Sequence, residues 1–567
     1  MLYWNKMKHI LIILVIGFLV YVNTLPNQFV WDDEEQVVNN PYIQSFANLP
    51  AIFKGSTFQT GGAGLSGWYY KPLMSFWFMT NYAFWGLRPF GFHLSQLFLH
   101  LFNSVLILLI FNQLFGGYGR KFAKLAAFFS GLIFAIHPAN VESVAYIAST
   151  QEVLYTFFLL LGLWLLSRRL DSLSLCLTIL LFFLALLSKE SAIIGVPLIF
   201  LYLWLKNRRQ TAFTWPGAAA VVVLLYFYLR AFVAKIPLSA PHLSPIAQAT
   251  FTSRLLTLPF EIFSYLRLIF FPLNLVIAQH QVVQQVSDFR FWGTLPIILV
   301  FFGILFRLLA KLRDRVAWFF FFWFAGSLGL VLNIFPLDMT IAERWLYFPL
   351  IGFLGLSSVI ILNFDKTVIN HKFVKVGGWL FLGLIIILFS SRTIARTFDW
   401  RNGLRLFSHD IKSNQEAFDL QNNFGVELFR AGKLSEAKSH FEKSTKLQLN
   451  WWTSFNNLGV VYEQEGDFQK ASQLYQQAIA NGDYYLAYEN LAFLMLKTEP
   501  LPETIKFVEE GLEKLPLNTR LRTVLVVAYY RDNRYDQALI EAKRLFQLNP
   551  TLQNQQLLEA IIRREKI

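Results

Sequence analysis

The sequence predicts an all-α protein in two parts: a polytopic membrane bundle of about eleven spanning helices, followed by a C-terminal tetratricopeptide-repeat solenoid. Of its 567 residues, 55% are hydrophobic and 17% aromatic, and the mean hydropathy is +0.44. This composition is typical of integral membrane proteins. Long apolar runs recur through the first two thirds of the chain, and a 34-residue repeat fills the last third.

The first apolar run, HILIILVIGFLVYV, follows Lys6 and Lys8 and resembles the core of a signal peptide. It has no small-residue cleavage site, and it leads directly into an acidic stretch. We therefore expect a retained membrane anchor.

Apolar segments long enough, or nearly long enough, to span a bilayer are spread over residues 1–391. They lie at about 9–25, 90–115, 122–137, 150–167, 171–187, 191–205, 213–233, 292–310, 316–335, 344–363 and 374–391. A further run at 254–272 carries Arg254, Glu261 and Arg267, which are costly in lipid. We expect this run to lie on the outer side as an amphipathic or re-entrant helix.

Loop charge sets the expected orientation. Residues 1–391 hold 27 Lys and Arg against 14 Asp and Glu, whereas residues 392–567 hold 23 against 22. The basic excess therefore indicates cytoplasmic loops rather than a nucleic-acid surface. With the N-terminus inside, eleven spans place both the loop 26–89 and everything after about 392 outside the cytoplasm.

Cysteine usage excludes two classes of site. Cys176 is the single cysteine and lies in an apolar run, so no internal disulfide and no Cys/His metal cluster can form. A small buried hydrophobic residue is the expected role for this side chain.

The polar C-terminal part repeats with a period of 34 residues, which is typical of tetratricopeptide helix pairs. Gly425 and Gly459 are 34 apart, as are Phe441 and Tyr475. We expect a linker or first helix at 392–417, four repeats over 418–552 and a capping helix at 553–567. Stacked repeats form a concave surface suited to peptides.

The stretch NQFVWDDEEQVVNNP carries the densest negative charge of the chain directly after the first span. A solvated, acidic helix start is one interpretation of Asp32 and Asp33, because carboxylates favour helix N-termini. The apolar residues just before them favour another, in which at least one carboxylate is partly desolvated and so a better base.

Further polar residues fall on the same expected side of the membrane. They are Lys71 in WYYKPLMSF, His137 and Glu142 in HPANVES, Lys189 and Glu190 in LLSKES, and Glu343 and Arg344 in AERWLYFP. Each alone could be a snorkelling side chain or a local ion pair. Together, a carboxylate base and nearby cations suit transfer from a lipid-linked phosphate: the base takes a hydroxyl proton and the cations hold the phosphate.

The order of FVWDDEEQVVNNPYI, YYKPLMSFWFMTNYAFWG, FGFHLSQLFLH, HPANVESVAYIAST, LLSKES, AERWLYFPLIGF and DWRNGLRLF resembles one known group. This group is the transmembrane and tetratricopeptide-repeat O-mannosyltransferases, a branch of the GT-C glycosyltransferases related to the protein O-mannosyltransferases. The resemblance covers nearly the whole chain, so residues 1–391 are expected to form a GT-C-like transferase domain.

The resemblance implies inverting transfer of mannose from a polyprenyl phosphate to a protein Ser or Thr hydroxyl on the non-cytoplasmic side. It assigns Asp32 and Asp33 as catalytic, with Asp32 the base, and Lys71 and Arg344 as ligands of the donor phosphate. His137, Glu142, Lys189, Glu190 and Glu343 are possible supporting residues. A divalent metal is compatible with this chemistry but is not required by it.

The expected partners are a polyprenyl-phosphate sugar, an acceptor polypeptide held by the repeats, and membrane lipid, without nucleic acid. A second interpretation belongs to another class: a non-catalytic, membrane-anchored scaffold whose repeats recruit partners for envelope or polysaccharide assembly. Replacement of Asp32 by Asn separates the two, since only an enzyme would lose sugar transfer.

Overall fold

The computed structural model of the chain describes residues 2–58, 68–237, 244–363, 372–482 and 484–565. Within these ranges the protein is helical, without a β-strand, and its single β-bridge pairs Gln279 with Ile341. The predicted all-α fold class, with membrane helices followed by tetratricopeptide repeats, is confirmed. Two compact units are present: the first contains Met1–Thr57 and Trp68–Ser413, and the second contains Asn414–Ile567.

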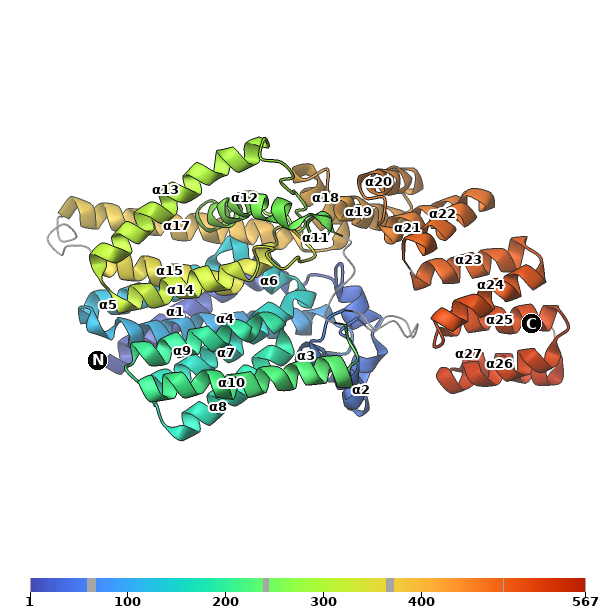
Figure 1. Cartoon of the computed structure of the whole chain (residues 1–567), viewed down its shortest axis with the longest axis horizontal. Helices are drawn as coiled ribbons and strands as arrows, with labels where there is room; N and C mark the ends of the chain where they lie inside the picture. The colour runs from blue at the N-terminus through green and yellow to red at the C-terminus, as the bar shows by residue number, and fades with distance from the viewer. Residues whose placement is uncertain (1, 59–67, 238–243, 364–371, 483, 566–567) are drawn as a thin grey trace. The chain divides into compact units, whose positions relative to one another are not determined.

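The long helices of the first unit mostly run in similar directions, and α13 is inclined to the rest (Figure 1). They are α1 (Leu2–Tyr21), α3 (Pro72–Trp85), α4 (Pro89–Leu114), α5 (Arg120–Ile136), α7 (Thr150–Arg168), α8 (Ser172–Ser188), α9 (Gly195–Leu205), α10 (Arg209–Tyr228), α12 (Phe251–Phe270), α13 (Phe289–Leu312), α14 (Arg315–Gly329), α15 (Tyr347–Leu362) and α17 (Lys372–Asp399). Shorter helices are α2 (Leu49–Lys54), α6 (Val141–Ala145), α11 (Pro245–Gln248) and α18 (Gly403–Ser413).

Seven helices of the described chain are long and apolar enough to cross a membrane, or eight if the bent pair Phe122–Ile136 and Pro138–Ala145 is one span. The chain is thus a multi-pass membrane protein, but this number is below the eleven expected. The expected segments at 171–187, 191–205 and 316–335 form helices of only 17, 11 and 15 residues. At a rise of about 1.5 Å per residue these are shorter than a hydrocarbon core of about 30 Å.

Polar side chains buried between helices fix the bundle. His100 of α4 contacts the Tyr347 hydroxyl at 2.9 Å through Nδ1 and the Ala135 carbonyl at 3.0 Å through Nε2. Ser130 of α5 lies 2.8 Å from Ser358 of α15, hydroxyl to hydroxyl. In lipid, where apolar surface adds little to helix association, such hydrogen bonds and close packing hold helices together.

The ends of α1 and α17 meet. Asn23 donates its side-chain amide to the Thr397 hydroxyl at 2.7 Å, and the Gln28 backbone N–H donates to the Arg401 carbonyl at 3.0 Å. The loop after α1 and the elbow between α17 and α18 therefore lie at the same end of the membrane bundle. The predicted linker from 392 packs, as far as Ser413, with the first unit.

The second unit consists of antiparallel helix pairs. They are α19 (Phe418–Arg430) with α20 (Leu434–Leu447), α21 (Trp452–Gln464) with α22 (Phe468–Asn481), α23 (Tyr485–Thr498) with α24 (Leu501–Lys514), and α25 (Thr519–Arg531) with α26 (Tyr535–Leu548), followed by α27 (Leu552–Arg563). A Cβ on Gly425 would lie 2.6 Å from the Phe441 ring, and one on Gly459 would lie 2.7 Å from the Tyr475 ring. Glycine therefore lets each aromatic ring lie against the partner helix.

Candidate active site

The acidic stretch begins with an unusual turn. Trp31 has φ +58°, in the left-handed region, although it is not glycine. A bulky residue held there costs about 1–3 kcal/mol and persists only where its surroundings fix it. The Trp31 ring stacks on Tyr146, with centroids 5.2 Å apart and an angle of 12° between planes. This turn directs the carboxylates of the next two residues to different environments.

Asp33 lies inside the protein. Its side chain is fully buried, Oδ2 accepts from the Val30 N–H at 3.0 Å, and Oδ1 accepts from the Ala148 N–H at 2.7 Å. Burial raises the pKa of Asp33 well above its usual range, while these backbone hydrogen bonds oppose the shift. Oδ1 thus joins the first loop to residue 148, while Oδ2 closes a turn within the loop, and this suits an orienting role.

Asp32 is half-buried. Its Oδ2 accepts a hydrogen bond from the Tyr146 hydroxyl at 2.7 Å. Burial raises the pKa of Asp32, and the opposing influences are the Tyr146 hydrogen bond and the positive charges of Arg344 and Lys71. A partly buried carboxylate that burial makes more basic, with a hydrogen-bond donor and two cations nearby, is suited to remove a proton from a hydroxyl.

Glu142 and Arg344 form a buried ion pair. Arg344 Nη1 lies 2.5 Å from Glu142 Oε1, and the Arg344 backbone N–H donates to Glu142 Oε2 at 2.8 Å. Glu142 is fully buried. Gln96 fixes the helix that carries Glu142 and the turn after it, because its side-chain amide donates to the Ser143 and Tyr146 carbonyls at 2.6 and 2.8 Å. Two residues predicted from separate motifs are thereby brought into direct contact.

A second charged group surrounds Lys71. The Lys71 ammonium lies 4.2 Å from the centroid of the Tyr69 ring, and within the described chain no carboxylate lies at ion-pair distance from it. Burial lowers the pKa of Lys71 to about 8, with Lys189 contributing and Glu190 and Glu152 opposing. Lys189 itself forms a buried ion pair with Glu152.

The charges of both groups, Asp32 with Arg344 and Lys71 with Glu190, are linked through Tyr69. Its hydroxyl donates to Asp338 Oδ2 at 3.4 Å. The Asp338 charge, burial and the charges of Glu190 and Asp32 raise the pKa of Tyr69 well above its usual range, and Arg344 opposes them. Lys71, Glu190, Asp32 and Arg344 therefore share one electrostatic neighbourhood.

Two predicted residues have other surroundings. His137 Nε2 contacts the Ile269 carbonyl at 3.1 Å, and its Nδ1 accepts from the Ala139 N–H at 3.2 Å, so both ring nitrogens are used in the fold. Glu343 is fully buried, and neither of its carboxylate oxygens accepts a hydrogen bond of normal geometry from a described residue. It is close enough to Arg396 and Glu142 for their charges to act on it. The geometry gives neither residue a place beside Asp32.

Sequence reasoning missed Tyr146, Glu152 and Asp338. Tyr146 lies in HPANVESVAYIAST and Asp338 in PLDMTIAERWLYFP, so both belong to recognised stretches in which only other residues were selected. Nothing in the local pattern marks a tyrosine as a hydrogen-bond donor to a carboxylate 114 residues away. Glu152 gave a weak signal as an acid at the start of an apolar helix.

No group of three or more His, Cys, Asp or Glu residues that could hold a metal ion is found over the part of the chain that the structure describes. An apolar groove of about 380 Å³ lies between the α9 region and α10. It is lined by Ile193, Ile194, Val196, Pro197, Pro216, Ala220, Val223 and Leu330. Ile193 and Ile194 belong to the short helix that Glu190 begins.

Comparison with known proteins gives matches over both parts of the chain. A family profile described as tetratricopeptide repeat matches residues 453–480. The human "Protein O-mannosyl-transferase TMTC3" is 24% identical over 588 residues, covering 90% of this chain and 61% of that protein. The predicted resemblance is confirmed. The chain is similar to the transmembrane and tetratricopeptide-repeat O-mannosyltransferases.

A second curated relative agrees in kind. "Protein O-mannosyl-transferase F38B6.6" of Caenorhabditis elegans is 24% identical over 464 residues, covering 78% of this chain and 63% of that protein. Among solved structures, "Crystal structure of YrrB: a TPR protein with an unusual peptide-binding site" is 18% identical, covers 28% of this chain and 82% of that one, and has a TM-score of 0.25. The chain spans about three fifths of the length of the two curated relatives.

Proposed function

We propose that this protein is an inverting glycosyltransferase that moves a hexose, mannose by family resemblance, from a polyprenyl-phosphate-linked donor to Ser or Thr hydroxyls of protein. The observation that carries the proposal is the state of Asp32, a half-buried carboxylate that accepts from Tyr146 and lies within the fields of Arg344 and Lys71. Similarity to named O-mannosyl-transferases over most of the chain supports the reaction class.

In this mechanism Asp32 removes the proton from the acceptor hydroxyl as its oxygen attacks the anomeric carbon. The new bond forms on the face opposite the phosphate, the carbon–oxygen bond to the phosphate breaks, and the electron pair leaves with the lipid phosphate. No general acid is needed, because a phosphate is a good leaving group at neutral pH. Asp33, with both oxygens held by backbone donors, orients the turn that carries Asp32.

Lys71 and Arg344 supply the positive charge for the donor phosphate. Lys71 has no carboxylate at ion-pair distance in the described chain. The Nη1 of Arg344 contacts Glu142. Among the described residues, its Nη2 has a 4.0 Å contact to Met339 Sδ, which leaves donor capacity for a phosphate oxygen. Cations that hold a leaving phosphate stabilise the charge that develops in the transition state.

The apolar groove beside Glu190 is a suitable place for the first part of the lipid tail. Its lining is almost entirely hydrocarbon, and two of its residues, Ile193 and Ile194, belong to the short helix that Glu190 begins. A polyprenyl chain in this groove would present its sugar-phosphate head to the end of the bundle that carries Asp32.

We also propose that this end faces away from the cytoplasm and that the repeats present the acceptor polypeptide there. The basis is the contact between the ends of α1 and α17, which places the acidic loop and α18 at one end of the bundle. Cleavage of the repeats by external protease in spheroplasts would support this orientation.

Transfer assays on the purified, membrane-reconstituted protein test the proposal. With a polyprenyl-phosphate mannose donor and a Ser/Thr-rich acceptor polypeptide, Asp32→Asn should lower kcat by roughly 10²–10⁴. Glu416→Gln is a control, because Glu416 is an exposed carboxylate outside the acidic run. The control should retain transfer within about twofold, since no reacting group is removed.

The alternative, a non-catalytic scaffold, is favoured by the tetratricopeptide match at residues 453–480. It predicts that the wild-type protein transfers no sugar from any polyprenyl-phosphate hexose, while still binding polypeptide through its repeats. Equal transfer by wild type and Asp32→Asn would remove Asp32 as the base but would keep an enzyme.

A further inference from the structure

Three aromatic rings form a column beside the proposed base. Trp31 stacks on Tyr146 at 5.2 Å between centroids, and Tyr146 stacks on Trp400 at 5.4 Å, with 29° between the last two planes. An arginine closes each end: the Arg344 guanidinium lies 5.9 Å from the Trp31 ring, and that of Arg396 lies 5.9 Å from the Trp400 ring. Stacked aromatic pairs and cation–π contacts both favour a fixed ring orientation.

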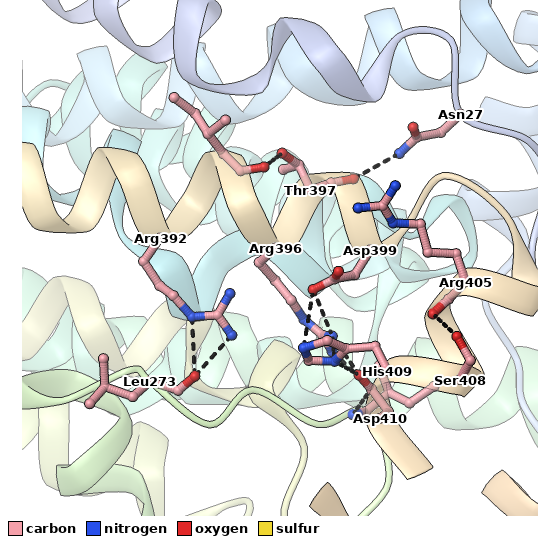
Figure 2. A network of polar contacts seen from close by, with 12 residues as sticks. Asn27, Leu273, Arg392, Arg396, Thr397, Asp399, Arg405, Ser408, His409 and Asp410 are labelled. Carbon is pink, nitrogen blue, oxygen red and sulfur yellow. Dashed lines mark hydrogen bonds and ion pairs between the residues drawn. The ribbon is translucent and has the colours of Figure 1, made fainter. Parts of the chain in front are cut away.

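Trp400 is itself held firmly. It is fully buried and directly follows α17. Figure 2 shows Arg396 of α17 directed at Asp410 of α18, with Nη1–Oδ1 and Nη2–Oδ2 distances of 2.6 and 2.9 Å. His409 Nδ1 lies 2.8 Å from Asp410 Oδ1. Because this fork–fork pair is geometrically specific, it fixes the elbow from which Trp400 projects.

The column connects this elbow to the acidic loop. The backbone N–H of Gln28 donates to the Arg401 carbonyl at 3.0 Å, next to Trp400. At the other end, Trp31 keeps its left-handed backbone while its ring covers Tyr146. Tyr146 is thus confined between two indoles, and the same tyrosine donates to Asp32 at 2.7 Å.

We propose that Trp400 is a positioning residue for the base: together with Trp31 it holds Tyr146 in the orientation that donates to Asp32. The physical reason is directional. A phenol that can turn about its side-chain bonds loses the short, nearly linear geometry on which a hydrogen bond to a carboxylate depends. The α17–α18 elbow is therefore coupled to the reacting end of the bundle through Trp400 and Tyr146.

Several other charged groups act on Asp32 and must be held constant in any test. They are Arg344, Asp338 and Lys71 from neighbouring segments, and Asp33 and Glu35 from its own loop. None of them stacks on Trp400, so a change at residue 400 reaches Asp32 through Tyr146, through the Arg401–Gln28 backbone contact or through a general loss of structure.

The inference gives a role to a residue of the proposed active site, and it can be tested without sugar transfer. Carbodiimides modify protonated carboxyl groups, so the pH dependence of Asp32 labelling, followed by mass spectrometry on the full chain in micelles, reports its protonation. Tyr146→Phe keeps the ring and loses the hydroxyl. It should shift the labelling midpoint upward by about one pH unit, because a donor that favours the carboxylate is lost.

Trp400→Met removes the stack and leaves the Tyr146 hydroxyl in place. We expect an upward shift of about half a pH unit, in line with the strength of an aromatic pair. Trp400→Phe restores a ring and should return the midpoint toward the wild-type value. Trp31→Met, on the other face of Tyr146, is a second variant that should shift it in the same direction.

Trp323→Met is the matched control. Trp323 is also nearly fully buried, stacks on Phe320 and, like Trp400, has an indole N–H without a partner among the described residues. Its replacement should leave the Asp32 midpoint unchanged. An unchanged midpoint in both Trp400→Met and Trp31→Met, or an equal shift in Trp323→Met, would overturn the inference. If the wild-type protein transferred no sugar, the proposed function would be wrong, but the effect of Trp400 on Asp32 labelling would still be tested.

Discussion

The two units of this protein use charged residues in opposite ways. In the membrane unit, ionic side chains are buried in pairs contributed by distant segments, such as Glu142 with Arg344. In the repeat unit, most ion pairs are exposed and local: the side chains of Lys433 and Glu436 are 54% and 57% exposed and lie three residues apart. The repeat core depends instead on apolar contacts such as Gly459 against Tyr475.

This difference indicates that the membrane unit carries the charges available for chemistry, whereas the charges of the repeat unit do not. Burying a charged pair is a poor way to gain stability, because desolvation offsets much of the attraction. A bundle that nevertheless buries several such pairs at one end has charges suited to act on a ligand. The repeat unit keeps most of its charges in water, where they contribute little, with the buried pair of Arg522 and Glu541 as an exception.

The largest effect is expected on breaking a buried pair. Glu142→Ala leaves the Arg344 guanidinium without its partner and should lower the free energy of unfolding of the membrane unit by about 3–5 kcal/mol. Detergent-induced unfolding of the purified protein measures this change. A loss below about 1 kcal/mol, the range of an exposed pair, would show that this pair is effectively solvated and would end the contrast between the units.

A smaller effect is expected in the repeat core. Gly459→Ala would place a Cβ 2.7 Å from the fully buried Tyr475 ring and should destabilise the repeats by about 1–3 kcal/mol. Gly511→Ala is the control, because its Cβ would meet Tyr488 at an ordinary 3.4 Å. The control should be neutral or slightly stabilising, since alanine favours a helix. Thermal unfolding followed by protease sensitivity of the repeats distinguishes the two.

The pH dependence of donor binding sharpens the functional side of the comparison. Burial lowers the pKa of Lys71 to about 8 from an ordinary value near 10.5, so its charge is lost as the pH rises through about 8. The KM for the lipid-phosphate donor should therefore rise by roughly threefold to tenfold between pH 7 and pH 9. Lys71→Arg stays charged and should remove this rise. A parallel rise in the Arg variant would assign the pH effect to another group.

The smallest effect is expected on the repeat surface. Lys433→Ala removes an exposed pair with Glu436 and should change the stability of the repeats by less than about 0.5 kcal/mol. The thermal midpoint in low and high salt checks this, because screening would already weaken such a pair. A larger loss would show that this exposed pair stabilises the repeats, which contradicts the contrast between the two units.

Much of the fold was predictable because its signals are local. Apolar runs set the positions of the membrane helices, and a Gly or small residue every 34 positions set the repeats. Fewer of the described helices than expected are long enough to span, because a run of apolar letters does not reveal where a helix ends. LLSKESAIIGVPLIF, for example, contains the break at Glu190–Ile194 that shortens α9.

The candidate site was predictable only as separate pieces. Asp32, Lys71 and Arg344 stand in recognisable motifs, but nothing in the spacing pairs Glu142 with a residue 202 positions away. Residues that act through orientation, such as Tyr146 and Trp400, carry no signature of their own, since aromatic residues are common throughout this chain.

By itself, the sequence determined the helical class, the membrane character and the repeat period, because hydrophobic periodicity and glycine spacing act over neighbouring residues. Only the tertiary structure decided which of two adjacent aspartates stays accessible. Asp33 is buried and accepts hydrogen bonds from two backbone N–H groups, whereas Asp32 accepts one from Tyr146. The left-handed turn at Trp31 and the packing of residues 146–148 direct the two side chains apart.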